Sequence, residues 1–333
     1  MIPIQNKEIR FANRPTGVPT ADTFQIVESF LPEPADGEVV LKTKFISVDP
    51  YLRGRMRDRR SYVEPFKLGQ VIESGLVGEV TESRSDLLKP GDVVTGYGDW
   101  RLYNVVKPDL WRKLPEGFPP SLSLGVLGMT GLTAYFGLLD IGQPREGETV
   151  VVSGAAGAVG MTVCQIAKLK GCRVVGIAGG PDKTQYLQKE LNVDAAVDYK
   201  SGDIQAALKQ ACPDGVDVYF DNVGGEVSDA VLLLIKNRAR IVICGQISIY
   251  NDDKPPIGLK PEPFILINRG LMKGFIITDY TDRFAEGITQ LGQWFAEGKL
   301  KHAESIIEGF ENTPAAFIGL FSGANLGKQI VKV

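Results

Sequence analysis

Three glycines in the stretch SGAAGAVG, at Gly154, Gly157 and Gly160, have a spacing that lets a backbone bind phosphate. The first two allow a tight turn and the close approach of a pyrophosphate, and the third lets the following helix pack closely on a sheet. The amino end of that helix would direct free N–H groups and a positive dipole end toward the anion. The stretch therefore predicts a phosphate-binding turn.

The residues around this turn must supply the elements that position it. TVVVS (149–153) predicts a strand, and the segment up to Lys170 predicts a helix because Val159, Val163, Ile166 and Ala167 fall on one face. RVVGIA (173–178) predicts a second strand. Strand, glycines, helix and strand in this order favour a dinucleotide site over a purely structural turn.

The end of the second predicted strand indicates which dinucleotide is bound. An NAD site places a carboxylate about 20 residues past the turn, where it would repel a 2′-phosphate. This chain has Ala178, Gly179 and Gly180 there, followed by Lys183, which can supply positive charge. Tyr199, after the third predicted strand, can offer a phenol donor. We therefore expect NADPH as the cofactor.

The pattern of predicted strands and helices changes along the chain, which predicts two domains. Residues 1–124 hold short β-type runs between Gly, Pro and Asp turns, and residues 300–333 show the same pattern. Residues 125–299 alternate apolar strands with helices, as a parallel sheet covered on both faces requires. We expect an α/β fold in which a doubly wound Rossmann domain follows a β-rich domain that the tail completes.

Composition argues against several other classes of protein. The formal net charge of -3 gives no broad positive field for nucleic acid. The basic run Arg53–Arg60 is interpreted as a solvated face, with an anion site as the alternative. No window approaches the roughly 18 apolar residues of a membrane span, and the amino terminus lacks the core of a signal peptide. We expect a cytoplasmic protein without a membrane partner.

The metal-ligating residue types are sparse. Cys164, Cys172, Cys212 and Cys244 form no CxxC pair, so we expect buried, reduced thiols. The single histidine, His302, lies in the polar stretch GKLKHAES and is expected at the surface. A catalytic zinc needs three protein ligands and a structural zinc needs four. No metal site is predicted.

Long motifs across nearly the whole chain resemble the zinc-independent medium-chain dehydrogenase/reductase superfamily. Within it the chain is similar to the leukotriene B4 12-hydroxydehydrogenase/prostaglandin reductase family, including its bacterial NADPH-dependent curcumin reductases. The motifs are SVDPYLRGRM (47–56), GMTGLTAYFGLLDIG (128–142), GAAGAVG (154–160), IAKLKGCRVVGIAGG (166–180), YFDNVGGE (219–226), ICGQISIYN (243–251), IIEGFENTPAAF (306–317) and NLGKQIVKV (325–333).

The resemblance implies a GroES-like amino-terminal domain, a Rossmann domain, NADPH between them and a homodimer. It places Lys183 and Tyr199 on the 2′-phosphate. It places the pyrophosphate against three residues of the turn, and other parts of the cofactor against four more. These are Gly157, Ala158 and Val159 for the pyrophosphate, and Asn222, Cys244, Phe275 and Asn325 for the border of the cofactor.

The family also implies a reaction, the reduction of the C=C bond of α,β-unsaturated ketones and aldehydes. Hydride reaches the β-carbon, and the charge that develops on the carbonyl oxygen needs a donor. The resemblance suggests Tyr250, in SIYN, as that hydroxyl, and a loop after a central strand is where Rossmann ligands bind. Tyr51, in VDPY, is either a second residue of the substrate site or a packing residue beside Pro50.

Three alternatives remain open at this stage. A zinc-independent quinone reductase would share the cofactor site. A methyltransferase would want an acidic residue where Ala178, Gly179 and Gly180 stand. A non-catalytic NADPH sensor would keep the glycines and Lys183 without a use for Tyr250.

Overall fold

The computed structural model describes residues 4–333, which form two compact units. The first contains the chain as far as Leu124 together with Glu304–Asn325 and Gln329–Val333. The second contains Gly125–Ala303 together with Leu326–Lys328. The chain thus passes from the first unit to the second twice, once for the long segment Gly125–Ala303 and once for the short segment Leu326–Lys328.

The second unit is built on a six-stranded sheet whose recorded pairs are all parallel. Its strands are β8 (Thr149–Ser153), β9 (Arg173–Ala178), β10 (Ala195–Asp198), β11 (Val216–Asp221), β12 (Ile235–Ile243) and β13 (Leu271–Gly274). The order across the sheet is β10-β9-β8-β11-β12-β13. Counted from the first strand this is 3-2-1-4-5-6, the order of doubly wound dinucleotide-binding sheets.

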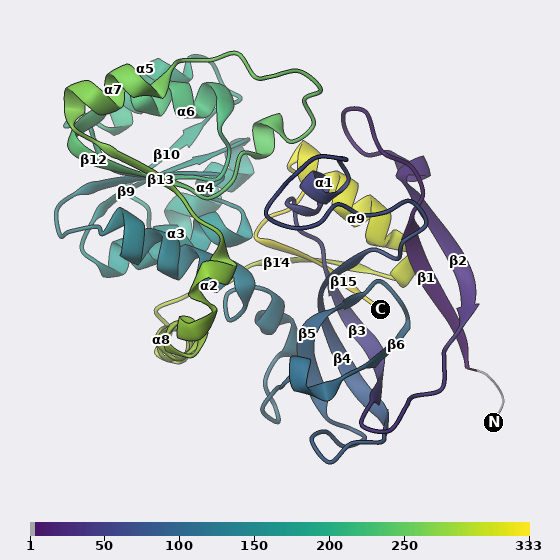
Figure 1. Ribbon diagram of the computed structural model, residues 1–333. Helices are drawn as coiled ribbons and strands as arrows, with labels where there is room; N and C mark the ends of the chain where they lie inside the picture. Colours follow the sequence, from purple (N-terminus) through teal and green to yellow (C-terminus); the bar gives the residue numbers. More distant parts are fainter. Residues whose placement is uncertain (1–3) are drawn as a thin grey trace. The chain divides into compact units, whose positions relative to one another are not determined.

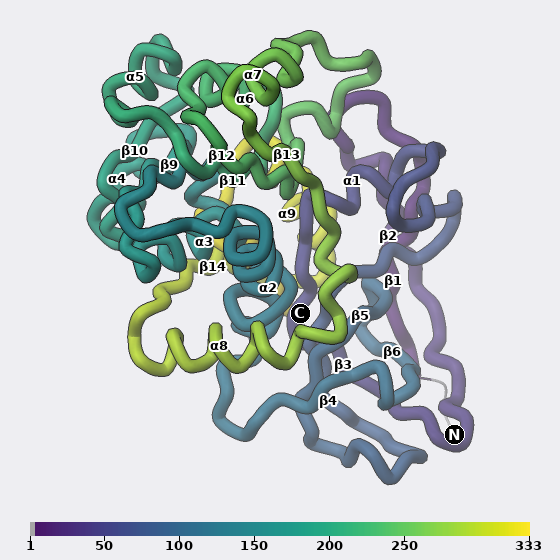
Figure 2. Tube along the Cα trace, turned by 60° about the vertical axis from the view of Figure 1, so that its left-hand side comes forward, coloured from purple at the N-terminus to yellow at the C-terminus, as the bar shows by residue number. Residues whose placement is uncertain are grey.

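Helices cover both faces of this sheet. They are α2 (Met129–Phe136), α3 (Ala158–Leu169), α4 (Pro181–Lys189), α5 (Ile204–Ala211), α6 (Gly225–Leu232), α7 (Pro261–Asn268) and α8 (Phe284–Ala296). In Figure 1, α2 and α3 lie on one face, while α5, α6 and α7 lie on the other. α2 packs against α3 and α8, and Figure 2 shows the same neighbours after rotation.

Burial on both faces explains the apolar strands. Every residue of β8 and of β11 is buried, and the core of this unit includes Val151, Val175, Tyr219 and Ile241. A strand covered on both sides cannot alternate polar and apolar residues, so it reads as a continuous apolar run. The expected strands and the helix after β8 are therefore confirmed, with Val163, Ile166 and Ala167 fully buried.

The first unit is rich in antiparallel strands. They are β1 (Gln5–Phe11), β2 (Phe24–Phe30), β3 (Val39–Ser47), β4 (Glu73–Ser83), β5 (Val93–Asp99), β6 (Tyr103–Val106), β7 (Arg112–Lys113), β14 (Glu304–Glu308) and β15 (Lys328–Lys332), with α1 (Leu52–Arg55) and α9 (Thr313–Gly319). β3 pairs antiparallel with β4, β6 and β15. The carboxyl-terminal strand is therefore part of the amino-terminal unit's sheet.

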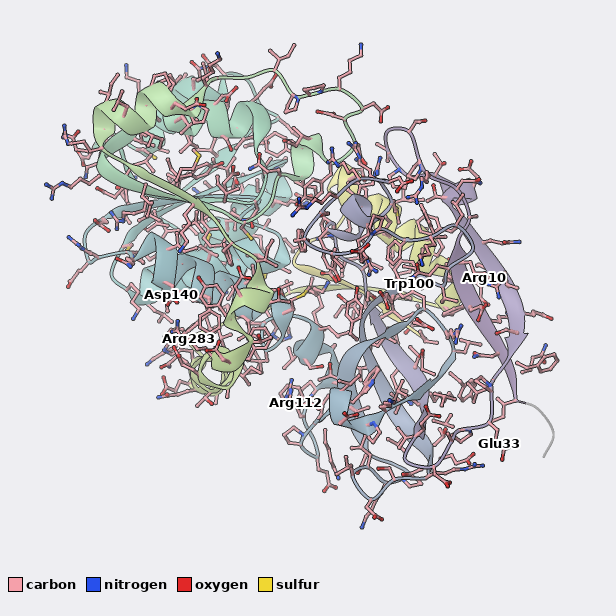
Figure 3. The ribbon with its side chains drawn as sticks, viewed as in Figure 1. Arg10, Glu33, Trp100, Arg112, Asp140 and Arg283 are labelled. Atoms are coloured by element: carbon pink, nitrogen blue, oxygen red, sulfur yellow. The ribbon has the colours of Figure 1, made fainter. Side chains whose placement is uncertain are left out.

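Trp100 lies in the core of the first unit and is fully buried (Figure 3). Its indole N–H donates to Ser74 Oγ over 2.7 Å, and its ring stacks on Phe24. Among residues 4–333, no helix has the length and apolar character needed to cross a bilayer. The predicted class, a doubly wound parallel sheet with a separate β-rich domain, is confirmed.

Candidate functional site: a dinucleotide turn and the loops beside it

The glycine turn begins where β8 ends, at Ser153. Gly154 has a φ of +58°, in the left-handed region that favours glycine. A Cβ on Gly160 would lie 2.2 Å from the carbonyl oxygen of Gly154, which excludes any larger residue there. α3 follows with Gly157 as its N-cap. Glycine is therefore required at position 154 by the backbone conformation and at position 160 by the lack of space for a Cβ atom.

The amino end of α3 fits a pyrophosphate. Gly157, Ala158 and Val159 are half-buried, while the residues on either side are buried. The first N–H groups of a helix have no partner within the helix, and they carry its positive dipole end. A Cβ on Gly157 would meet only the oxygen of Gly154, at 3.3 Å, so the space outside the turn is open to a ligand. Contact with a cofactor remains a prediction for these residues.

The end of β9 is covered by the ring of Tyr199. A Cβ on Gly179 would lie 2.8 Å from Cε1 of Tyr199 and 2.9 Å from Cε of Lys200. Asp198 fixes this corner, because its Oδ1 accepts hydrogen bonds from the N–H groups of Gly180 and Lys200, over 2.8 and 2.9 Å. The Ala-Gly-Gly sequence thus makes room for a phenol and a lysine.

Lys183 has a second lysine, Lys200, as an electrostatic neighbour. Lys183 lies in the first turn of α4 and is half-buried. Burial lowers its pKa, and the charge of Lys200 lowers it further. Two cations and a phenol beside a helix amino terminus suit a phosphate. Lys200 was not among the residues predicted from the sequence, although its position directly after Tyr199 was a usable signal.

Asn222 and Cys244 follow the ends of β11 and β12. The Asn222 side-chain amide donates to the Ser153 carbonyl over 2.8 Å, so Asn222 is attached to the start of the glycine turn. The Cys244 N–H donates to the Asp221 carbonyl over 2.9 Å. These bonds bring the predicted border residues to the same sheet edge as the turn.

The prediction for the four cysteines is corrected at one position. All four are free thiols, and Cys164, Cys172 and Cys212 are buried, but Cys244 is only partly buried because it stands beyond the end of its strand. Burial of the sulfur raises the pKa of Cys244 to about 12. Its thiol therefore stays protonated and is a poor nucleophile.

Tyr250 closes the loop that follows β12. Its hydroxyl accepts a hydrogen bond from the Gln246 N–H over 3.3 Å. A Cβ on Gly245 would lie 3.4 Å from this hydroxyl and 3.2 Å from the Asn222 carbonyl oxygen. The phenol is half-buried, and burial raises its pKa. The hydroxyl therefore keeps its proton and can donate it in a hydrogen bond.

Phe275 and Asn325 are the remaining predicted border residues. Phe275 directly follows β13, and a Cβ on Gly137 would lie 2.6 Å from its Cζ atom, so the ring packs against the glycine that follows α2. Asn325 belongs to the first unit and is the residue directly before Leu326–Lys328. Within that segment, the Gly327 N–H donates to the Ala156 carbonyl over 2.8 Å, on the glycine turn itself.

Tyr51 stands at the start of α1 in the first unit and packs against its core. Its hydroxyl lies 3.2 Å from that of Tyr97, which accepts a hydrogen bond from Arg55 Nη1 over 2.9 Å. Burial raises the pKa of Tyr51 well above its ordinary value, and the neighbouring Tyr97 adds to the shift. The packing and the hydroxyl contacts are both present, so neither earlier interpretation of Tyr51 is eliminated.

The interpretation of the basic run as a solvated face is wrong for two of its arginines. Arg53 is fully buried and donates to the carbonyls of Pro15 and Gly17. Arg55 is 4% exposed, pairs with Glu73 over 2.7 Å and covers the Phe66 ring. Charge alone misled the prediction, because α1 turns these side chains inward onto backbone carbonyls. The residues that follow, 58–60, are exposed.

Two further features lie apart from these loops. His302 is exposed, and within residues 4–333 no group of three or more His, Cys, Asp and Glu side chains is arranged to hold a metal ion. A hollow of about 660 Å³ in the second unit is lined by Leu139, Asp140, Gln143, Pro144, Lys170, Lys273 and Tyr280. Asp140 pairs there with Arg283 (Figure 3).

The sheet order, the glycine turn on its first strand and the open helix end after it define a dinucleotide-binding α/β protein. Two family models match the chain: the N-terminal domain of oxidoreductase over residues 7–114, and zinc-binding dehydrogenase over residues 158–293. The chain belongs to the zinc-independent medium-chain dehydrogenase/reductase family, as its motifs predicted.

Full-length relatives support this assignment. A protein of Bacillus subtilis described as an NADP-dependent oxidoreductase, YfmJ, is 54% identical over 98% of this chain and 97% of its own length. The NADPH-dependent curcumin reductase of Escherichia coli is 45% identical over 99% and 97%, and prostaglandin reductase 1 of Rattus norvegicus is 45% identical over 95% of each chain. The predicted enzyme class, an oxidoreductase, is confirmed.

Solved structures agree. CurA of Vibrio vulnificus in complex with NADPH is 45% identical, covers 98% of this chain and 99% of its own, and superposes with a TM-score of 0.95. Quinone oxidoreductase of Escherichia coli in complex with NADPH has a TM-score of 0.79 at 21% identity over 98% and 100% of the chains. The second likeness shows the fold alone. The first agrees with NADPH as the predicted cofactor.

Proposed function

We propose that this protein catalyses the NADPH-dependent reduction of the C=C bond of α,β-unsaturated ketones and aldehydes. One observation carries the proposal: a protonated phenol, Tyr250, is held at the carboxyl edge of a dinucleotide-binding sheet, beside the loop of Asn222. The names of the curcumin and prostaglandin reductases support the same reaction class.

In this proposal the chain holds NADPH through the residues described above. Lys183, Tyr199 and Lys200 bind the 2′-phosphate, and the backbone of Gly157, Ala158 and Val159 binds the pyrophosphate. Asn222, Cys244, Phe275 and Asn325 border the rest of the cofactor. When bound, NADPH supplies the hydride that adds to the β-carbon of the substrate.

The protein's own contribution is to meet the negative charge that develops on the substrate carbonyl oxygen. The Tyr250 hydroxyl accepts from the Gln246 N–H, so its own hydrogen can point to that oxygen. Because burial raises the pKa of Tyr250, the phenol remains a donor at neutral pH. One preorganised donor of this kind stabilises an oxyanion transition state by about 3 kcal/mol.

We propose that Tyr51 is a second residue of the substrate site. Arg55 donates to the Tyr97 hydroxyl, which lies 3.2 Å from that of Tyr51. This chain of polar groups fixes the Tyr51 hydroxyl while its ring packs on the core. A ring fixed in this way orients a substrate by contact with its face.

We further propose a homodimer formed through β13. This strand ends one side of the six-stranded sheet, and a sheet edge offers unpaired N–H and C=O groups to another chain. Leu271 on β13 is 47% exposed, and Leu266 and Ile267 on α7 are 78% and 70% exposed. Two copies related by a twofold axis would cover these residues together.

The four free thiols support a reducing, cytoplasmic location.

The test measures NADPH oxidation with a straight-chain enone, in parallel with NADH and with benzoquinone. We expect turnover of the enone with NADPH, and we expect Tyr250→Phe to lower kcat by about a hundredfold. Turnover of the quinone but not the enone would move the protein to the quinone reductases. Tight NADPH binding without turnover of either substrate would instead indicate a sensor.

A further inference from the structure

The carboxylate of Asp221 is the most heavily hydrogen-bonded side chain near the candidate site. It stands at the end of β11 and is 1% exposed. Six donors point to its two oxygens: Ser153 Oγ, Tyr219 Oη, Val223 N, Gly224 N, Ser228 Oγ and Gln246 Nε2, over 2.6 to 2.9 Å. A buried carboxylate is tolerated when hydrogen bonds of this kind replace its water.

Two of these donors, Tyr219 and Ser228, lie on β11 and α6, and the other four lie in or beside three loops at the same edge of the sheet. Ser153 ends β8 and begins the glycine turn, and Val223 and Gly224 belong to the loop between β11 and α6. Gln246 belongs to the loop after β12. One carboxylate therefore ties together the loops that carry the turn, Asn222 and Tyr250.

Gln246 connects this carboxylate to Tyr250. Its side-chain amide donates to Asp221 Oδ2 over 2.9 Å, while its backbone N–H donates to the Tyr250 hydroxyl over 3.3 Å. Gly224 leaves room for the amide, because a Cβ there would lie 2.2 Å from Gln246 Oε1. Both ends of Gln246 are thus fixed, one by Asp221 and the other by the phenol.

Charge strengthens this connection. All six groups that contact the two Asp221 oxygens are hydrogen-bond donors from neutral residues. A hydrogen bond to a buried charge is stronger than one between neutral groups, and its loss leaves the charge partly unsatisfied. The Gln246 side chain is therefore held firmly in one orientation.

We propose that Asp221 and Gln246 are positioning residues that set the Tyr250 hydroxyl for catalysis. Neither is assigned a contact with substrate; both act through the loop after β12. The proposal rests on the role given to Tyr250 above. It adds that the position of the Tyr250 hydroxyl depends on the buried carboxylate of Asp221, at the end of the neighbouring strand β11.

The test is a double-mutant cycle with Gln246→Ala and Tyr250→Phe. We expect Gln246→Ala to lower kcat for the enone about tenfold, while the Kd for NADPH changes less than about twofold. In the Tyr250→Phe background the same substitution should have no further effect on kcat. Gln293→Ala, which removes an exposed glutamine on α8, is the matched control.

Two results of this cycle would overturn the proposal. One is an equal loss of kcat in both backgrounds, and the other is a loss confined to NADPH affinity. Gln246→Glu adds a pH readout. Two facing carboxylates repel, so kcat should fall further than in the alanine variant and recover as the pH is lowered, when the introduced carboxyl is protonated and can donate to Asp221. A pH profile parallel to that of the natural chain would also contradict the proposal.

A measurement without turnover separates this proposal from the proposed function. Hydrogen exchange of the 244–251 amides in cofactor-free protein should be faster in Gln246→Ala than in Gln293→Ala. If Tyr250→Phe retains full activity, the catalytic role of Tyr250 fails, and exchange then decides whether Gln246 still holds the loop. Unchanged exchange would overturn the positioning proposal by itself.

Discussion

The ring of Tyr199 lies against Gly179 so closely that a Cβ on the glycine would be 2.8 Å from Cε1 of the ring. Gly179→Ala should therefore displace Tyr199 and weaken NADPH binding about tenfold, in line with an overpacking cost of about 1 to 3 kcal/mol. Fluorescence titration with NADPH measures this. Gly292→Ala, where a Cβ meets nothing within 4 Å, should leave affinity unchanged. Equal affinities for NADPH in the two variants would contradict the assignment of Tyr199 to the 2′-phosphate.

Lys200 is expected to matter for cofactor choice as much as Lys183. Each lysine replaced by alanine should raise the Kd for NADPH about tenfold, because each removes a charge-assisted bond to phosphate. The Kd for NADH should not change, since NADH lacks the 2′-phosphate. Lys189→Ala, in the last turn of the same helix α4, is the control. A loss of NADH affinity as well would point to a damaged fold.

The affinity for NADPH should fall as pH rises into the alkaline range. Burial and Lys200 lower the pKa of Lys183, so the free protein loses this charge at a lower pH than an ordinary lysine would. A bound phosphate favours the charged form, so binding takes up a proton above that pKa and weakens with pH. Calorimetric titrations at several pH values should show this for NADPH, and Lys183→Ala should flatten the slope.

Buried Arg55 is expected to stabilise the first unit. Arg55→Met leaves Glu73 and the Tyr97 hydroxyl without their donor, so it should lower the free energy of unfolding by about 3 kcal/mol. Arg59→Met, at an exposed position of the same run, should change it little. Denaturant unfolding of both variants gives the comparison. Similar unfolding midpoints would contradict the expected loss of stability in Arg55→Met.

A substitution on the edge strand β13 tests the proposed dimer. Leu271→Lys places a charge on this edge, and we expect it to convert a dimer to a monomer. Leu110→Lys, at a position of the first unit that is 73% exposed, should leave the mass unchanged. Sedimentation velocity separates the two species. A Leu271→Lys variant that stays dimeric would show that another surface forms the interface.

Local patterns were sufficient for the α/β sheet and its glycine turn. The apolar runs at 149–153 and 216–221 are buried on both faces, so burial and sequence carry the same information there. Gly160 was recognisable because its neighbour is only six residues away, at Gly154. A strand or a turn whose residues lie close together in the sequence can be predicted without knowing the rest of the fold.

Features that depend on distant residues were not predictable from the sequence. The donors to Asp221 span positions 153 to 246, and the acceptors of Arg53 lie 36 and 38 residues away. Nothing near Arg53 in the sequence indicates those carbonyls, so its charge suggested water instead. Gln246 lies within the motif ICGQISIYN, but the motif did not single it out, because its importance comes from a carboxylate on another strand.

The late return of the chain has a consequence for how the protein is made. Gly327 supports the glycine turn and β15 pairs with β3, yet both come later in the chain than every other described strand of the two sheets. Domains generally begin to fold during synthesis, amino-terminal part first. Here the amino-terminal sheet must wait for β15, and the turn for Gly327, until residues 327–332 have been synthesised. A chain truncated before residue 327 would leave both units unfinished.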